Sequence, residues 1–346
     1  MITIRDVARE AGVPAPTVAR ILRGGNKEVW QGASERAEKV RRAAERLGYR
    51  PNTSARAVRT GRSGTVALLL STARNRSVLF ADLLDGIQAE LSARGMRLTV
   101  ASIPDEKLDT PGFVPKVLQE WSADGLLVNY YQEFPKRMNQ LIRRDRIPSV
   151  WMNSRQDADC VHPDDAGAAR VATEELVSLG HRRIAYLRMA RAAGGHYSMR
   201  DREKGYRAAM KRAGLKAQVC ELDDIWGGED VRVRQCVELL RRRERPTAVV
   251  AYEMASAGPL MHAAGRQKLD VPRDLSVVTF HTDPVRDHGV PLKVMRVPLF
   301  EVGKRATAML MDKLDRPRRR VPARAVPYTK GEGVIAPPTG ARRGNG

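Results

Sequence analysis

Cysteine, aromatic residues and long apolar runs are all scarce in this 346-residue chain. Its three cysteines, Cys160, Cys220 and Cys236, lie far apart and form no C-x-x-C pair. This argues against a disulfide framework or a zinc site and favours free thiols in a reducing compartment. No stretch approaches the roughly 18 apolar residues of a membrane helix, and the N-terminus lacks an apolar run of signal-peptide length. We therefore expect a cytoplasmic protein without a membrane partner.

Recognisable motifs of catalysis are absent too. The sequence has no G-x-G-x-x-G, no G-x-x-x-x-G-K-[ST], no G-x-S-x-G and no H-E-x-x-H, and its six histidines are scattered. We expect no enzymatic activity, no cofactor, no catalytic residues and no metal site.

Positive charge, in contrast, is abundant. The formal net charge is +21 and the sequence pI is about 10.5. Such a balance points to an anionic partner, nucleic acid before a membrane surface, although a general bias towards Arg and Ala is the alternative. Residues 1–62 carry fourteen Lys and Arg against six Asp and Glu, a steeper excess per residue than in the remainder. A nucleic-acid interface is therefore expected at the N-terminus.

The segment 3–22, TIRDVAREAGVPAPTVARIL, predicts two short helices joined by a turn. Ile4, Val7, Ala8 and Ala11 recur at helical spacing, after a capping box formed by Thr3 and Asp6. Gly12 supplies the turn, and Pro14 is tolerated at the start of a second helix, whose buried face is Val18, Ile21 and Leu22. Two short helices with a basic outward face form a helix-turn-helix. The alternative is a small helical domain with a solvated charged face.

These residues resemble the N-terminus of the lactose-repressor (LacI/GalR) family of bacterial transcription regulators. A second match is Leu47-Gly48-Tyr49-Arg50-Pro51-Asn52, where the family's DNA-binding headpiece ends. The resemblance implies a helix-turn-helix headpiece at 1–50 and a hinge at 51–63. In the family, the hinge becomes helical on the operator and inserts an apolar residue, usually Leu, into the minor groove. Val58 stands at that position, and Asn52 and Arg56 would hold phosphate or the groove floor.

Residues 64–336 alternate between apolar strands and helices, as in doubly wound parallel sheets. After the headpiece, two such halves resemble the family's two-lobed effector-binding and dimerisation domain, which is similar to periplasmic binding proteins. Residues 337–346 have no apolar pattern and are expected to be disordered. The expected strands are 65–70, 98–101, 125–128, 149–152, 184–187, 248–251, 276–280, 293–297 and 326–328. The expected helices are 79–94, 114–121, 138–144, 166–179, 203–212, 230–243, 256–264 and 300–314, with a third headpiece helix at 29–48 that starts from an N-cap at Ser34.

Base reading is expected from the start of the second helix. There the family's two specificity positions are Ala15 and Pro16, which have no hydrogen-bonding side chain and can only press on a thymine methyl. Arg20 can reach guanine or a phosphate, and Thr3 and Thr17 complete the expected DNA contacts. A homodimer would place two such helices in successive major grooves, so the expected partner is a near-palindromic double-stranded operator.

The resemblance also implies a small-molecule effector between the lobes. Arg202 matches an arginine that holds the effector, while Phe80 and Trp226 fall where other members have cleft aromatics; packing is the alternative for both. Two family motifs are altered, so that Glu253 and His281 occupy positions that are usually aspartate. An imidazole suits an anion better than a sugar hydroxyl pair, so the effector is expected to be anionic or sugar-like. Loss of small-molecule binding stays open.

The sequence therefore predicts a dimeric DNA-binding transcription regulator, a repressor, whose operator affinity changes when an effector alters the tilt of the lobes. A solute-binding protein would explain the lobes but not residues 1–62. A DNA-binding regulator whose cleft no longer binds an effector is the alternative that differs only at the cleft.

Overall fold

The computed structural model describes residues 2–22, 31–49, 62–73, 76–113, 115, 123–131, 134–190, 195–223, 228–287 and 289–339. Its internal contacts divide the chain into two units, Met1–Ser63 (the headpiece) and Gly64–Gly346 (the two-lobed unit). Within these described ranges, no helix is long and apolar enough to cross a membrane.

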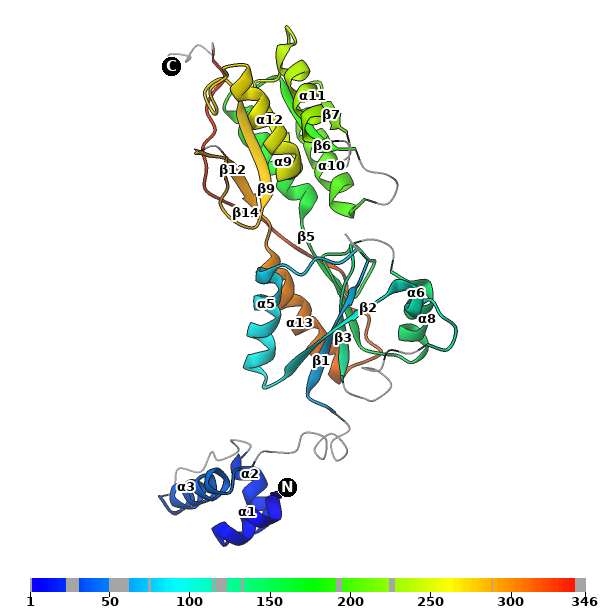
Figure 1. The fold of residues 1–346 in the computed structure, drawn as a ribbon, viewed down its shortest axis with the longest axis vertical. Helices are drawn as coiled ribbons and strands as arrows, with labels where there is room; N and C mark the ends of the chain where they lie inside the picture. The colour runs from blue at the N-terminus through cyan, green and yellow to red at the C-terminus, as the bar shows by residue number, and fades with distance from the viewer. Residues whose placement is uncertain are drawn as a thin grey trace. The chain divides into compact units, whose positions relative to one another are not determined.

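The described residues of the headpiece form the helices α1 (Ile4–Ala11), α2 (Ala15–Leu22) and α3 (Gln31–Arg46) (Figure 1). One apolar cluster holds them together, because each helix turns a small or branched side chain inward. The fully buried members are Val7, Ala11, Val18, Ile21, Ala37, Val40, Ala43 and Ala44. The expected third helix is present, but it begins at Gln31, three residues before Ser34, so the N-cap prediction for Ser34 is wrong.

Lobe 1 of the two-lobed unit is a parallel sheet of six strands in the order β13-β5-β4-β3-β1-β2. Its strand β1, which lies between β3 and β2, is buried along its whole length, because helices cover both faces of the sheet. The elements are β1 (Thr65–Ser71), α5 (Ala81–Ala93), β2 (Arg97–Ile103), α6 (Asp105–Leu108), β3 (Gly125–Asn129), α8 (Lys136–Arg144), β4 (Ser149–Met152), β5 (Cys160–Pro163), α13 (Leu299–Asp315) and β13 (Arg324–Val326).

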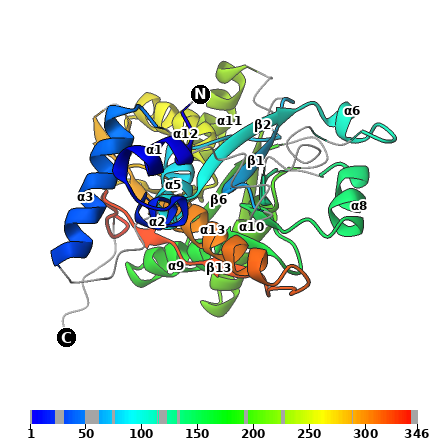
Figure 2. The same ribbon diagram turned by 90° about the horizontal axis from the view of Figure 1, so that it is seen from below.

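Successive residues of the lobe 1 strands point to opposite faces and meet different helices. Val66 and Leu68 pack with α5 and α13, whereas Ala67 and Leu69 pack with α6 and α8. Figures 1 and 2 show these two helix pairs on opposite sides of the sheet.

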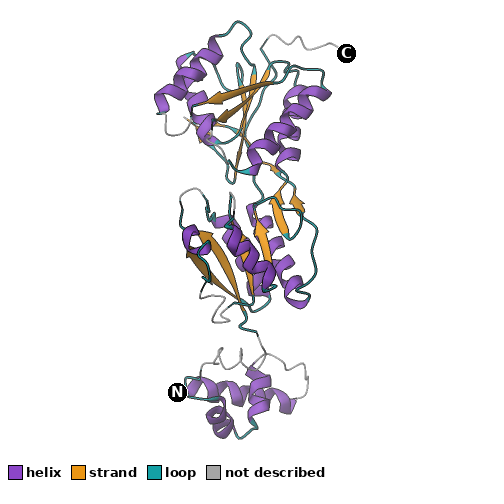
Figure 3. Cartoon of the chain, turned by 90° about the vertical axis from the view of Figure 1, so that its right-hand side faces the viewer, coloured by secondary structure: helices purple, strands orange, loops and turns teal. Residues whose placement is uncertain are grey.

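Lobe 2 repeats this plan with strand order β14-β12-β9-β8-β6-β7, in which only β14 runs antiparallel. Helices α9 and α10 cover one face and α11 and α12 the other, so both sheets lie between helical layers (Figure 3). The elements are α9 (Asp165–Ser178), β6 (Ile184–Met189), α10 (Tyr197–Arg212), β7 (Gln218–Leu222), α11 (Glu229–Arg241), β8 (Ala248–Ala251), α12 (Met254–Arg266), β9 (Ser276–His281), β10 (Arg286–Asp287), β11 (Val290–Pro291), β12 (Lys293–Arg296) and β14 (Thr329–Lys330).

The chain passes between the lobes three times, after β5, between β12 and α13, and between β13 and β14. A proline lies in each passage, at Pro163, Pro298 and Pro327. The second passage returns α13 and β13 to lobe 1 and the third takes β14 back to lobe 2, so neither half of the sequence forms a lobe alone.

The expected two doubly wound parallel lobes are confirmed, with local corrections. Five of the described elements were not expected, namely α6, β5, β7 and the two-residue strands β10 and β11. Helix α10 begins at Tyr197, six residues before the expected start, because a cap at His196 rather than an apolar repeat begins it. The last expected strand, 326–328, is also misplaced, since β13 ends at Val326 and β14 begins at Thr329. Most of the expected helix 114–121 and the end of the tail lie outside the described residues.

Candidate nucleic-acid interface and interlobe site

The helix-turn-helix is fixed by local hydrogen bonds. The backbone N–H and the hydroxyl of Thr3 both donate to a carboxylate oxygen of Asp6, at 2.8 and 2.7 Å, within the expected capping box. Hydrogen bonding to Thr3 lowers the pKa of Asp6, so this carboxylate is ionised near the positive end of α1. Gly12 ends α1 with φ of 65°, a left-handed conformation that glycine adopts freely. The carbonyl oxygen of Pro14 then accepts from the N–H groups of Thr17 and Val18, and α2 begins at Ala15.

Packing leaves one face of α2 available to a partner. Val18 and Ile21 are buried against the other two helices, Pro16 and Arg20 are exposed, and Ala15 and Thr17 are partly buried. The predicted DNA-contact residues of α2 are therefore on its outward side. Asn52, Arg56 and Val58 of the predicted hinge lie outside the described residues, as does Trp226.

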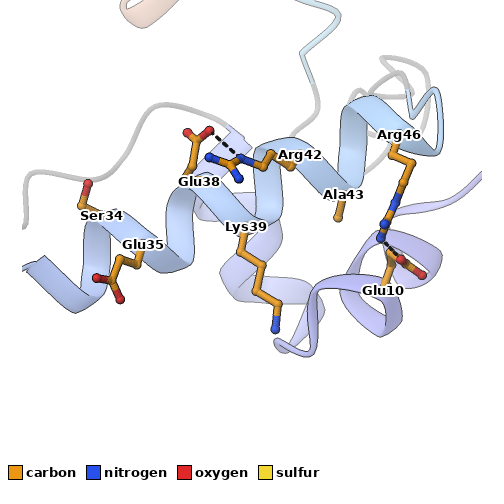
Figure 4. A pocket seen from close by; sticks show the side chains of 8 residues that line it. All are labelled: Glu10, Ser34, Glu35, Glu38, Lys39, Arg42, Ala43 and Arg46. Carbon is orange, nitrogen blue, oxygen red and sulfur yellow. Dashed lines mark hydrogen bonds and ion pairs between the residues drawn. The ribbon is translucent and has the colours of Figure 1, made fainter.

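A hollow of about 790 Å³ between α1 and α3 is a different part of the headpiece surface (Figure 4). Its walls carry both signs of charge, because Glu38 pairs with Arg42 at 3.0 Å and Glu10 pairs with Arg46. The second pair joins α1 to α3. A surface of mixed sign attracts a phosphate backbone poorly, so the hollow is not the DNA interface.

In lobe 2, Arg202 lies at the centre of a buried network. Its Nε donates to Asp165 at 2.7 Å, Nη1 donates to the carbonyl oxygen of Tyr252 at 2.7 Å, and Nη2 donates to the hydroxyl of Tyr328 at 2.9 Å. The side chains of Arg202 and Asp165 are 9% and 1% exposed. Because the carboxylate lies against the guanidinium, the positive charge of Arg202 is compensated inside the protein.

Aromatic rings surround this ion pair. The guanidinium carbon lies 4.3 Å from the ring centre of Phe280, 4.8 Å from that of Tyr252 and 5.9 Å from that of Tyr328. Burial raises the pKa of Tyr328 well above its usual value, so its hydroxyl remains protonated and donates to Asp165 at 2.7 Å. The other carboxylate oxygen of Asp165 is buried without a hydrogen-bond partner in the part of the chain that the structure describes.

The start of α10 joins the two lobes. A ring nitrogen of His196 lies 2.9 Å from the carbonyl oxygen of Asn153, which follows β4 of lobe 1, and the Tyr197 hydroxyl donates to the Asn153 side chain at 3.3 Å. An ion pair between Arg155 and Asp201 lies in the same region. Burial raises the pKa of Tyr197, so this hydroxyl also stays a donor. We name His196, Tyr197 and Asn153 the interlobe bridge.

The other predicted effector residues that the structure describes are Phe80, Glu253 and His281. Phe80 is the N-cap of α5 and is 39% exposed. Glu253 is the N-cap of α12, in a capping box with Ser256. His281 ends β9 with its ring 41% exposed, and its Nδ1 accepts from the N–H of Asp283 at 3.0 Å. The sequence interpretation missed Asp165, Tyr252, Tyr328 and the interlobe bridge. For Asp165 the only local signal in the sequence was its position beside a second acid, Asp164, directly after β5.

The comparisons with known proteins agree with this architecture. Residues 3–52 match the family of bacterial regulatory proteins, lacI family, and residues 173–331 match the periplasmic binding protein-like domain. The HTH-type transcriptional regulator GntR of Pseudomonas aeruginosa is 30% identical over 322 residues, with 89% of this chain and 88% of that protein covered. The chain belongs to the LacI family. It is therefore a DNA-binding transcription regulator.

Other LacI-family relatives cover the chain to the same extent. The repressor PurR of Vibrio campbellii is 28% identical over 326 residues, with 91% of this chain and 92% of that protein covered. The solved structure of the transcriptional regulator CelR with cellobiose has 25% identity and a TM-score of 0.63, and covers 96% of this chain and 99% of its own. The lac repressor dimer bound to operator is 21% identical with a TM-score of 0.69, which shows the shared fold.

Proposed function

We propose that this LacI-family protein is a homodimeric repressor that reads a near-palindromic operator through α2. The observation that carries the proposal is the outward placement of Ala15, Pro16 and Arg20 on a helix whose other face is buried. Thr3 and Thr17 contact the phosphate backbone, and Asn52, Arg56 and Val58 of the hinge contact the minor groove.

The chemistry of these side chains sets the reading. Ala15 and Pro16 offer apolar contact with a thymine methyl but no hydrogen bond to a base edge. Arg20 has the donors that a guanine requires, so it carries most of the base discrimination. The half-site therefore has weak preference opposite Ala15 and Pro16 and a strong guanine dependence opposite Arg20.

Selection of bound sequences from a random DNA pool, at one fixed salt concentration, tests this reading. We expect an enriched near-palindrome. Arg20→Ala should weaken binding to it by about 1–3 kcal/mol while leaving random DNA less affected. Arg9→Ala, which changes an exposed cation of α1, is the control and should weaken both kinds of DNA equally. If Arg20→Ala weakened binding to the enriched sequence and to random DNA equally, this result would contradict the role of Arg20 in base reading.

We further propose that the effector is a neutral, hydroxyl-bearing molecule rather than an anion. The Arg202–Asp165 pair has no net charge, so it offers an anion little attraction. In the described part of the chain Arg202 uses three of its five N–H donors, and one oxygen of Asp165 has no donor. A hydroxyl group both accepts and donates, and so can satisfy both residues, whereas an ionised carboxylate or phosphate oxygen can only accept.

The alternative, a regulator whose cleft no longer binds an effector, also has a supporting observation. The interlobe bridge joins the lobes directly, through two hydrogen bonds to Asn153. Thermal unfolding of the protein with panels of neutral saccharides and of organic phosphates distinguishes the two. A saccharide that raises the melting temperature supports the neutral effector, a phosphate alone contradicts it, and no shift with either panel favours the alternative.

A further inference from the structure

The amino ends of the lobe 2 strands carry an unusual density of positive charge. The chain leaves this sheet for lobe 1 from the carboxyl end of β12. The amino ends of the parallel strands therefore lie at the opposite end of the sheet, which we call its amino edge. Four segments lead into the strands at that edge: 178–183, 211–217, 241–247 and 265–275. They contain twelve Lys and Arg against three Asp and Glu, a steeper excess than in the headpiece. We name these cations the amino-edge cluster: Arg182, Arg183, Lys211, Arg212, Lys216, Arg241, Arg242, Arg243, Arg245, Arg266, Lys268 and Arg273.

Hydrogen bonds between three of these segments place them side by side. Nε of Arg183 donates to the carbonyl oxygen of Arg245 at 2.9 Å, and Nη1 of Arg245 donates to the carbonyl oxygen of Asp274 at 2.9 Å. Nε of Arg241 donates to the Gln267 side chain at 3.2 Å. The fourth segment enters β7, which pairs with β6 next to them. Apart from Arg245, which is partly buried, every cation of the cluster is exposed. The cluster is therefore one accessible surface.

The needs of the fold account for only part of this charge. Helices α10, α11 and α12 end at this edge, and Lys211, Arg212, Arg241 and Arg266 lie in their last turns, where a cation favours the helix dipole. Arg273 pairs with Asp270 and Asp274. The other seven cations lie outside the helices, and no described carboxylate forms an ion pair with them. Their mutual repulsion is unfavourable to folding, which is the pattern expected of a surface that binds polyanions.

The surface lacks the groups that protein partners normally use. Interfaces between proteins depend on buried aromatic or aliphatic anchors. Among the described residues, none of the exposed large hydrophobic side chains, Ile2, Val78, Phe80, Val100, Phe300 and Val334, falls in the four segments. Nine of the twelve cations are arginines, which match phosphate oxygens in pairs. Phosphate without base reading fits this chemistry better than an acidic protein does.

We propose that the amino-edge cluster binds the phosphate backbone of a second DNA duplex, independently of base sequence. One protein would then hold one duplex with its headpieces and another with lobe 2. Binding at the cluster depends on salt, because each contact releases counterions from the DNA. It does not depend on the operator or on the effector.

A bridging assay tests the proposal without a known operator. One biotinylated duplex of arbitrary sequence is immobilised and loaded with the full-length protein. A second, fluorescent duplex is then added at fixed salt, and its capture is measured. The test variant is Lys216→Glu/Arg243→Glu, which reverses two exposed cations of the cluster. The matched control is Lys136→Glu/Arg143→Glu, which makes the same charge change on the exposed side of α8 in lobe 1.

We expect capture of the second duplex to fall about tenfold in the test variant and to change less than about twofold in the control. Loading on the first duplex and the urea midpoint should be alike for all three proteins. Equal capture by all three would mean that the headpieces alone bridge DNA, and would overturn the proposal. Capture of poly-L-glutamate but not of DNA by the wild-type protein would assign the surface to an acidic polypeptide, and would overturn it too.

Discussion

Replacing Asp165 by Asn changes one charge at the centre of lobe 2 and almost nothing else. The amide oxygen can still accept from Arg202 and Tyr328, but the guanidinium loses the charge of Asp165 that compensates it. Removing one partner of a buried ion pair costs 3–5 kcal/mol, and the aromatic faces around Arg202 recover about 1 kcal/mol of that. Because the pair is only 2.7 Å apart and at most 9% exposed, we expect Asp165→Asn to lower the free energy of unfolding by about 3 kcal/mol.

Urea unfolding followed by circular dichroism measures this loss. Asp164→Asn is the matched control, since Asp164 caps α9 through the N–H of Gly167 and Asn caps a helix about as well as Asp. The variant should also acquire a response to phosphate, because its uncompensated guanidinium can now attract an anion. A loss below about 0.5 kcal/mol, or equal stabilisation of the wild-type protein by phosphate, would refute the view that Asp165 neutralises Arg202.

Two further predictions concern stability. A methyl group at Gly205 would overlap the backbone of α9, so Gly205→Ala should lower the free energy of unfolding by about 1–3 kcal/mol. The control is Gly258→Ala, which has open space around the added methyl group and should leave the free energy of unfolding equal or higher. The urea midpoints of the two variants test this difference. Burial lowers the pKa of His181 below its usual 6.5, so the folded state resists protonation and loses stability as the pH falls below about 6.5. The loss of stability between pH 7.5 and pH 5.5 should be smaller in His181→Gln than in the wild-type protein, and unchanged in the control His262→Gln, whose side chain is exposed. If the wild-type protein and both variants had the same pH dependence, His181 would not contribute to this loss.

The regular elements were largely predictable because burial imposes a period on them. Strand 248–251 was predicted to the residue, and the buried faces predicted for α1 and α2 pack into the headpiece core. Strand β7 was missed, because it lies at the edge of its sheet and most of it is only partly buried, which leaves no continuous apolar run. The first turns of α10 were missed because their side chains contact Asn153, Asp165 and Tyr252 rather than forming an apolar stripe.

The surroundings of Arg202 were beyond prediction for a different reason. Its position was correctly singled out, but its charge state depends on Asp165 and Tyr328, which lie 37 residues before it and 126 residues after it in the chain. A periodic pattern identifies which side of a helix is buried, not which distant residue it meets. The expectation of an anionic effector depended on the imidazole of His281 with Arg202 nearby, and the buried carboxylate of Asp165 compensates the charge of Arg202.

The return of α13 and β13 to lobe 1 has a consequence for synthesis on the ribosome. The lobe 1 core joins Val66 and Leu68 to Leu310 and Val326, so it cannot close until nearly the whole chain has emerged. The buried residues of the lobe 2 cores lie between Ala168 and Met295 and emerge earlier, whereas Tyr328 and β14 join lobe 2 only after β13 has been made; the headpiece is complete first. A nascent chain should therefore carry a folded headpiece and the packed cores of lobe 2 on either side of an open, protease-sensitive β1–β5 segment until its last residues are made.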